Sequence, residues 1–375
     1  MQCLNFCMMN RVLRRVRARI SREKLTPFLV WICAASLLQS LLHGTRGPCV
    51  ETFLRDATFS DAALNDERIL ETENAIRRSA LPDADISCDS SSGSMRIVRS
   101  SRVSNMCWYA NDYLRILRQV HRSKRLHDFI VCDRDCAQAD MRIFSLAKSR
   151  KIVDVRNRTV SVVPVNVGRH FKWVRHALFD RWTYDSKLPV ALWRGVSTSG
   201  CWNMHSDSIA NRAECARRNL ATRWSLHNSS KVDIGITKLV QVSPDSEMKL
   251  KILLKKSMTV RSMLKYRYLV SVEGNDVATN LKWALASNSV VFMPEPTRES
   301  FILESNLQPW VHYVPLRHDT EDLERKVDYC EENKLHCRQI SKAATEYMKY
   351  FATRRRLFSL GAQVYERHFE KLANM

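Results

Sequence analysis

Glycine is scarce in this sequence, and its scarcity excludes two common kinds of nucleotide-binding site. The 375 residues include only nine glycines. No set of them has the spacing of the G-x-G-x-x-G dinucleotide loop or of the G-x-x-x-x-G-K-S/T phosphate loop, both of which need glycine for a tight turn against phosphate. A nucleotide bound by this chain must therefore be held in another way.

Acidic residues are also few. The chain has 39 Asp plus Glu against 60 Lys plus Arg, which gives a formal charge of +21. Such an excess favours an anionic partner, which can be nucleic acid, a lipid surface or a phosphorylated substrate. The surplus is spread along the chain and is densest before an apolar run, so we do not expect nucleic acid. Hydrophobic residues make up 45% of the chain, enough for ordinary cores, and the length indicates two domains.

The apolar run lies near the N-terminus. Residues 27–42 carry no charge and follow the basic segment 1–24. Their length lies between a signal-peptide core and a full membrane span, and we interpret residues 25–43 as a signal anchor. Positive charge ahead of the run keeps the N-terminus cytoplasmic. This predicts a single-pass type II protein of the endoplasmic reticulum or Golgi membrane with a lumenal remainder. The alternative is a buried core helix with a basic tail.

A lumenal chain can form disulfides and carry N-glycans. None of the twelve cysteines makes a C-x-x-C pair and no histidine cluster accompanies them, so a zinc site is not expected. We predict a disulfide between Cys201 and Cys215. Cys330 and Cys337 lie about two turns apart in an expected helix, too far for a bridge along a straight helix. Acceptor sequons begin at Asn157 and Asn228.

The chain changes character after a polar N-terminal third. Residues 44–105 are rich in serine and arginine towards their end, which is typical of a stem or exposed loop. A globular pattern follows, with an expected helix over 108–120 and a strand over 129–132 that ends in a polar turn. Further strands are expected over 160–167 and 188–195.

The clearest pattern lies in the second half. A buried strand over 266–272, a helix over 277–287 and another strand over 289–293 predict a βαβ unit. The right-handed crossover makes the strands parallel, and ligands bind beyond the carboxyl ends of such strands. We expect Asn275 or Asp276 to cap the helix and its free amides to meet an anionic oxygen. The alternative is an ordinary polar turn.

The residues around this unit resemble the core of glycosyltransferase family 90. The resemblance is strongest over 265–313, which begins K-Y-R-Y-L-V-S-V-E-G-N-D-V-A-T-N-L-K-W, and it extends from about 106 to 360. It is closest to the lipopolysaccharide-modifying branch, because Glu273 and Asn280 stand where the animal O-glucosyltransferases have Asp and Arg. Further marks of the family are W-R-G at 193–195, V-D-I-G at 232–235 and H-D-T-E-D-L-E-R-K at 318–326.

The resemblance implies an α/β fold of GT-B type, in which two Rossmann-like domains face a cleft. It implies inverting transfer of a hexose or pentose, with glucose or xylose favoured, from a UDP-sugar to a hydroxyl of a glycan or glycoprotein, without a metal. The UDP-sugar would be held mainly by the C-terminal domain. In chain order we expect a basic cytoplasmic tail (1–24), the anchor (25–43), the stem (44–105), an N-terminal acceptor-side domain (106–190), a C-terminal donor domain (191–337) and C-terminal helices (338–375).

Inverting transfer needs a base for the acceptor hydroxyl and positive charge for the leaving diphosphate. Family members take the base from an Arg-Asp pair at a strand end of the N-terminal domain, which matches Arg134 and Asp135, although Cys136-Ala137 replaces the aromatic-Pro that often follows. We therefore assign the base to Asp135. The donor site implied by the match comprises Arg194, Gly195, Glu273, Gly274, Asn275, Asp276, Asn280, Lys282 and Glu299. Of these, Arg194 is expected to meet the diphosphate and Glu299 a ribose hydroxyl.

Plainer interpretations stand beside these assignments. Lys282 can be a solvated surface lysine and Glu299 a surface carboxylate. Residues 133–135 also spell Asp-x-Asp, the manganese-binding signature of the other large glycosyltransferase fold. On a non-enzymatic alternative, the chain is an inactive lumenal glycan-binding or scaffold protein of the same fold.

Overall fold

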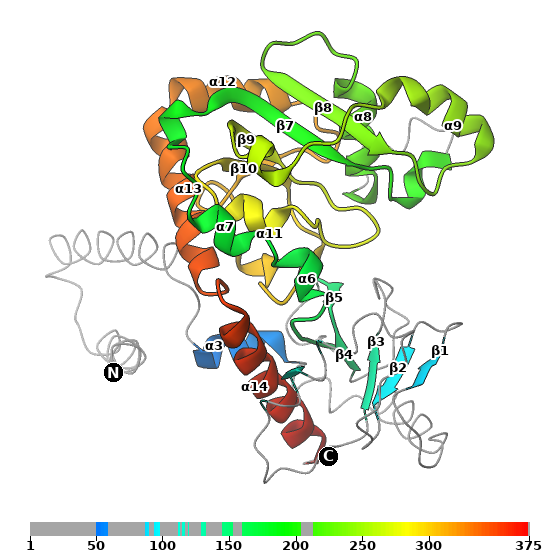
Figure 1. The fold of residues 1–375 in the computed structure, drawn as a ribbon, viewed down its shortest axis with the longest axis vertical. Helices are drawn as coiled ribbons and strands as arrows, with labels where there is room; N and C mark the ends of the chain where they lie inside the picture. The colour runs from blue at the N-terminus through cyan, green and yellow to red at the C-terminus, as the bar shows by residue number, and fades with distance from the viewer. Residues whose placement is uncertain are drawn as a thin grey trace, which may run out of the picture.

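The computed structural model describes residues 50–58, 87–89, 94–97, 129–132, 145–152, 160–203 and 213–373, with single residues between 112 and 119. Within them the chain forms two five-stranded sheets, joined by a two-stranded one (Figure 1). We call the sheet with the longer strands, which contains β7 to β10, the larger sheet, and the other the smaller sheet. The expected anchor, Asp135 and Asn157 lie outside the described residues. No helix of the described part is both long and apolar enough to cross a membrane.

The larger sheet is parallel throughout. Across the sheet the order is β12, β10, β9, β7 and β8. β7 pairs with both β8 and β9, so the winding reverses between β7 and β9, as in doubly wound folds. The predicted βαβ unit is confirmed, because β9 and β10 pair in parallel. The bounds are β7 (Leu188–Val196), β8 (Val232–Lys238), β9 (Tyr266–Val270), β10 (Val290–Pro294) and β12 (Val314–Leu316).

Helices cover both faces of this sheet. Tyr268 and Val270 of β9 belong to a core with α8 and α12, whereas Leu269 between them belongs to a core with α7 and α11. Strands buried on both faces are apolar almost continuously, which is why the 266–272 pattern was recognisable. The helices are α7 (Val174–Leu178), α8 (Ala216–Trp224), α11 (Leu281–Leu285), α12 (Leu323–Glu332) and α13 (Lys334–Lys349), which contributes to both cores.

The smaller sheet has three parallel strands and an antiparallel edge. β3, β4 and β6 run parallel, β2 pairs antiparallel with β3, and β1 pairs antiparallel with β2. Two helices that are far apart in the sequence, α3 and α14, contact each other beside it (Figure 1). The bounds are α3 (Val50–Ala57), β1 (Ser87–Asp89), β2 (Ser94–Ile97), β3 (Phe129–Cys132), β4 (Ser145–Ala147), β6 (Val160–Val162) and α14 (Arg354–Ala373).

Shorter elements complete the described chain. β5 and β11 form an antiparallel pair that links the two sheets in space. The bounds are β5 (Ser149–Lys151), α6 (Val167–His170), η4 (Tyr184–Ser186), η5 (Gly200–Asn203), η7 (Ala213–Cys215), α9 (Pro244–Leu250), η8 (Lys251–Leu253), α10 (Val260–Met263), β11 (Arg298–Ser300) and η9 (Glu304–Asn306).

Three sets of contacts cross the expected segment boundaries, which stay predictions. From the stem expected over 44–105, Phe53 of α3 packs against Phe301, and β2 pairs with β3. α7, before the expected boundary at 190/191, packs on α11 of the larger sheet. α14, from the expected C-terminal helices, returns to the smaller sheet, where His368 Nδ1 lies 2.9 Å from Ser161 Oγ.

The two cysteine predictions had different outcomes. The disulfide between Cys201 and Cys215 is confirmed. The expectation that Cys330 and Cys337 cannot bridge is wrong, because they form a disulfide with 5.6 Å between their Cα atoms. The reason is a break in the helix: Asn333, with φ −113° and ψ 48°, separates α12 from α13 and turns the two cysteines towards each other.

Candidate functional site

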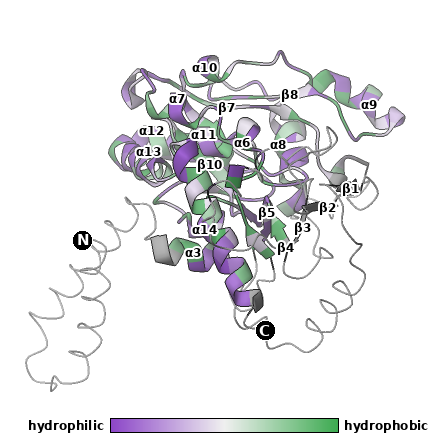
Figure 2. Ribbon diagram, turned by 60° about the horizontal axis from the view of Figure 1, so that its bottom comes forward, coloured by the Kyte–Doolittle hydropathy of each residue, from purple (hydrophilic) through white to green (hydrophobic). Residues whose placement is uncertain are grey.

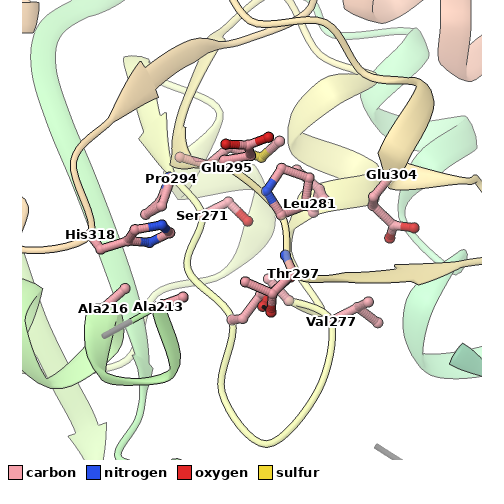
Figure 3. A pocket seen from close by; sticks show the side chains of 14 residues that line it. Ala213, Ala216, Ser271, Val277, Leu281, Pro294, Glu295, Thr297, Glu304 and His318 are labelled. Carbon is pink, nitrogen blue, oxygen red and sulfur yellow. Dashed lines mark hydrogen bonds between the residues drawn. The ribbon is translucent and has the colours of Figure 1, made fainter. Parts of the chain in front are cut away.

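A small open pocket lies at the carboxyl ends of neighbouring strands of the larger sheet (Figure 3). Ser271 follows β9, Pro294 ends β10, and His318 follows β12, so each of three strands supplies part of the wall. Thr297 and Glu304 face the same space from the chain after β10. This is where doubly wound sheets bind their ligands.

Glu273 forms part of the wall and fixes the loop after β10. Its carboxylate accepts hydrogen bonds from the backbone N–H groups of Thr297 (3.0 Å) and Arg298 (3.1 Å), and from the Thr297 hydroxyl. Burial raises the pKa of Glu273 above its ordinary value, although these bonds act in the opposite direction. Among the predicted donor residues, all of which the structure describes, only Glu273 lines the pocket.

Beside Glu273 the backbone passes very close to an arginine of α8. A Cβ atom at Gly274 would lie 2.6 Å from Nη1 of Arg217, so glycine is required there. The Arg217 guanidinium donates to carbonyl oxygens at the ends of β7 (3.2 Å) and β9 (2.9 Å), and its buried Nε has no partner among the described residues. Burial lowers the pKa of Arg217 to about 10.

Among the described residues, no close carboxylate balances the charge of Arg217. No described Asp or Glu forms an ion pair with it, and its largest favourable electrostatic neighbour is Glu273, whose carboxylate is committed to the loop after β10. An enclosed cation without a counter-ion is costly unless an anion joins it. Arg217 follows the pocket-lining Ala216 and lies against Gly274, so it marks a position beside the pocket that can receive an anionic group.

Arg194 and Gly195 organise the end of β7. Arg194 donates from Nη2 to Asp233 Oδ2 at 2.6 Å and from Nη1 to the Asp233 carbonyl at 2.9 Å. Burial would raise the pKa of Asp233, but hydrogen bonds from Arg194 and Lys255 outweigh it and lower that pKa. A Cβ atom at Gly195 would lie 2.4 Å from the Trp193 ring. The structure thus gives both residues a packing role, and their contact with a donor stays a prediction.

Two predicted donor carboxylates lie in buried ion pairs between the sheets. Asp276 Oδ2 lies 2.6 Å from Lys148 Nζ, and Glu299 Oε1 lies 2.7 Å from Arg150 Nε. Both partners belong to the chain around β5, which pairs with β11, so these contacts fix one sheet against the other. The interpretation of Glu299 as a surface carboxylate is wrong, because it is fully buried.

Lys282 is also buried, so its interpretation as a solvated lysine is wrong. Its Nζ pairs with Glu304 Oε1 at 3.2 Å. His170 lies nearby at the end of α6, and its buried Nδ1 has no partner among the described residues. Burial, followed by the charges of Lys282 and Lys148, lowers the pKa of His170 well below its usual value. The imidazole is therefore neutral in the folded protein.

The expected capping of the helix after β9 is wrong. α11 begins only at Leu281, and Asn280, at its N-cap position, makes no side-chain cap. The Asn280 carboxamide instead accepts from Ser271 Oγ (3.1 Å) and donates to the Val270 carbonyl (2.9 Å). Asn275 is exposed, and Asp276 is turned towards the smaller sheet. A helix this short offers little for an anion site.

The structure adds two residues that the sequence prediction did not include. His318 lines the pocket, and its buried Nδ1 has no partner in the described part of the chain. It opens the H-D-T-E-D-L-E-R-K string, so the family motif held a signal for it. Arg217 had no such signal, because nothing in its local sequence separates it from Arg218 beside it.

The chain is similar in sequence to proteins named as O-glucosyltransferases. O-glucosyltransferase LpsA of Dichelobacter nodosus is 48% identical over 95 residues, which are 25% of this chain and 30% of that protein. Protein O-glucosyltransferase 2 of Danio rerio is 27% identical over 167 residues, 44% of this chain and 29% of that protein. Protein O-glucosyltransferase 3 of Homo sapiens is 29% identical over 117 residues, 31% and 23% of the two chains.

The matched region thus spans less than a third of the length of each of these relatives. The model of the family described as Glycosyl transferase family 90 matches residues 132–359, which is more than half of the sequence. The chain belongs to glycosyl transferase family 90.

Proposed function

We propose that this chain is an inverting glycosyltransferase of GT-B type and that the pocket beyond β9 and β10 holds a UDP-sugar. The observation that carries the proposal is the position of Arg217. Among the described residues this cation has no counter-ion, and it lies beside Gly274 and next to the pocket-lining Ala216, at the carboxyl ends of a doubly wound sheet. A diphosphate carries the negative charge that would balance the Arg217 guanidinium.

The proposed reaction is a single displacement. The acceptor hydroxyl attacks the anomeric carbon, the bond from that carbon to the diphosphate oxygen breaks, and UDP leaves with the electron pair. Asp135 takes the hydroxyl proton, and Arg217 with Arg194 supplies positive charge in place of a metal. Glucose or xylose is the proposed sugar, and a glycan or glycoprotein the proposed acceptor.

A lumenal location in the endoplasmic reticulum or Golgi is part of the proposal. Two disulfides support it, because such bonds form and persist in oxidising compartments. The Asn228 side chain is exposed in the turn between α8 and β8, where a glycan can be attached. Attachment to the membrane through residues 25–43 stays a prediction.

The donor site is tested by UDP titration and by slow hydrolysis of UDP-glucose, UDP-xylose and UDP-galactose without acceptor. The chain from residue 45 contains every described residue and suits both assays. Arg217→Ala should weaken UDP binding by about 10- to 150-fold, because a lost charge-assisted hydrogen bond costs roughly 1.5 to 3 kcal/mol. Arg218→Ala, the next residue of α8, is the matched control and should bind UDP normally. Unchanged affinity in Arg217→Ala would move the diphosphate elsewhere.

The base is tested separately. Asp135→Asn keeps the side-chain volume but removes proton acceptance, so turnover should fall by about 10² or more while donor affinity stays nearly constant. Asp133→Asn should have a much smaller effect, and EDTA none. Equal loss from both variants together with EDTA sensitivity would support the Asp-x-Asp metal site and reject both the assigned base and the metal-free reaction.

A further inference from the structure

One side of the larger sheet carries exposed cations that have no counter-ion in the described part of the chain. The cations lie on α7, on the segment after it and around α10, and we call this set the α7–α10 surface. None of its members forms an ion pair with a carboxylate of the described residues. The members are Lys172, Arg175, Arg181, Arg261 and Lys265, all exposed.

The acidic residues nearest in sequence are already engaged. Between residues 160 and 203 the chain has only Asp180 and Asp185. Asp180 pairs with the buried Lys187 at 2.6 Å, and Asp185 pairs with Arg338 at 3.2 Å. The segment 248–272, which includes α10, contains no Asp or Glu. The positive charge of the surface is therefore not neutralised by its own segments.

Aromatic side chains lie among these cations. Phe179 is 76% exposed, and Trp173 and Trp182 are half-buried. Lys172 Nζ lies 5.2 Å from the centre of the Trp173 ring, and Lys265 Nζ lies 5.9 Å from that of Trp182. The second contact joins the end of α10 to the segment after α7, in agreement with the nearness of the two helices in Figure 2. The Lys265–Trp182 contact thus links the cations around α10 to the aromatic residues after α7.

We infer that the α7–α10 surface binds a bilayer containing anionic phospholipids. A single exposed apolar residue is normal for a soluble protein. An exposed Phe with half-buried Trp and several unpaired Lys and Arg is the composition of membrane-interface segments, whose cations meet headgroup phosphates while the rings enter the interface. An acidic polysaccharide or acidic protein segment satisfies the cations but leaves Phe179 facing a polar surface.

The position of this surface is compatible with an active pocket. The carbonyl oxygens of Asp180 and Trp182 accept hydrogen bonds from Asn288, which lies just before β10, so the surface adjoins the amino ends of the parallel strands. The pocket lies at their carboxyl ends. Membrane binding at one end of the sheet leaves the pocket open at the other, so this inference does not depend on what the pocket binds.

The test is co-sedimentation of the chain from residue 45 with phosphatidylcholine vesicles, with and without phosphatidylserine. Every described contact lies within that part of the chain, and it lacks the expected anchor. We expect binding only with phosphatidylserine and weaker binding at higher salt. Combined Arg175→Gln, Arg181→Gln and Lys265→Gln should weaken binding on the order of 100-fold, and Phe179→Ser about 10-fold.

Two control variants match these changes. Leu335→Ser removes a comparably exposed apolar side chain, 72% exposed, at the corner between α12 and α13. Combined Arg223→Gln, Lys231→Gln and Arg317→Gln removes three cations that have carboxylate partners. Both controls should bind vesicles like the parent chain. Thermal unfolding of each variant checks that the fold is kept.

Three outcomes would overturn the inference. The first is binding to heparin, used as a soluble acidic polysaccharide, without binding to vesicles. The second is equal loss of vesicle binding in the surface variants and in their controls. The third is unchanged vesicle binding in Phe179→Ser. That result would show that the Phe179 ring does not enter the bilayer, as the inference requires.

Discussion

Two regions of the molecule use the same contact, an ion pair, with different consequences. Between the sheets, Lys148–Asp276 and Arg150–Glu299 have side chains no more than 5% exposed. On the outer side of the larger sheet, Arg223 and Glu321 lie 2.8 Å apart with 43% and 44% of their side chains exposed. The exposed ions keep most of their hydration, whereas a buried ion depends on its partner.

The comparison shows where the relative position of the two sheets is decided. The buried pairs flank the β5–β11 ladder, so charge and backbone pairing act at the same junction. A displacement of the smaller sheet would separate these ions without exposing them fully to water. The exposed Arg223–Glu321 pair joins elements of the larger sheet alone, so it does not determine how the two sheets are positioned against each other.

Breaking the junction should have the largest effect. Asp276→Ala removes the buried carboxylate that lies 2.6 Å from Lys148 Nζ, so the free energy of unfolding should fall by about 3 to 5 kcal/mol. Urea denaturation measures this. Adding Lys148→Met to that variant should recover part of the loss, since it removes the buried positive charge that Asp276 had paired with. A loss below about 1 kcal/mol from Asp276→Ala would mean that the buried ion pair contributes no more to stability than an exposed one.

Acid should weaken the same junction through His170. The unfolded imidazole takes up a proton near its ordinary pKa of 6.5, whereas burial keeps the folded one neutral at lower pH. Stability should therefore fall as pH drops below about 6.5, by up to about 1.4 kcal/mol per pH unit. His170→Gln should flatten this slope between pH 7 and 5. His176→Gln, on the neighbouring helix, is the control, and an unchanged slope in His170→Gln would rule out this residue as the cause.

Breaking the outer pair should have the smallest effect. Glu321→Ala leaves Arg223 in water, so the free energy of unfolding should change by less than about 1 kcal/mol. The same urea denaturation applies, and added salt should reduce the difference further. A loss comparable to that of Asp276→Ala would show that exposure is not what distinguishes the regions.

The sequence was informative where local patterning decides the structure. The strands over 129–132, 188–195 and 289–293 lie within a residue or two of their predicted ends, because runs of apolar residues bounded by polar turns determine them. The helix after β9 is shorter than predicted, because Asn280 is held by Ser271 and the Val270 carbonyl rather than entering the helix. The hydrophobic periodicity of the sequence does not reveal a side-chain contact of this kind.

The candidate site was predictable only in part. Glu273 belongs to a long and specific motif, and it does line the pocket. Arg217 reaches the pocket edge from a helix far away in sequence, and the partners of Asp276 and Glu299 come from the distant segment around β5. A single sequence shows residue types and spacing, and these contacts depend on how separate elements meet.

The last helix has a consequence for how the protein is made. α14 contacts α3 and β6, and Phe351, just before α14, packs against Phe53 of the first described helix, with 5.8 Å between ring centres. The two ends of the described chain therefore complete one core. During synthesis on the ribosome, the strands of the larger sheet emerge before α14, so α3 completes its packing only after this twenty-residue helix has followed. A premature stop before α14 would thus leave α3 without the contacts that this helix supplies.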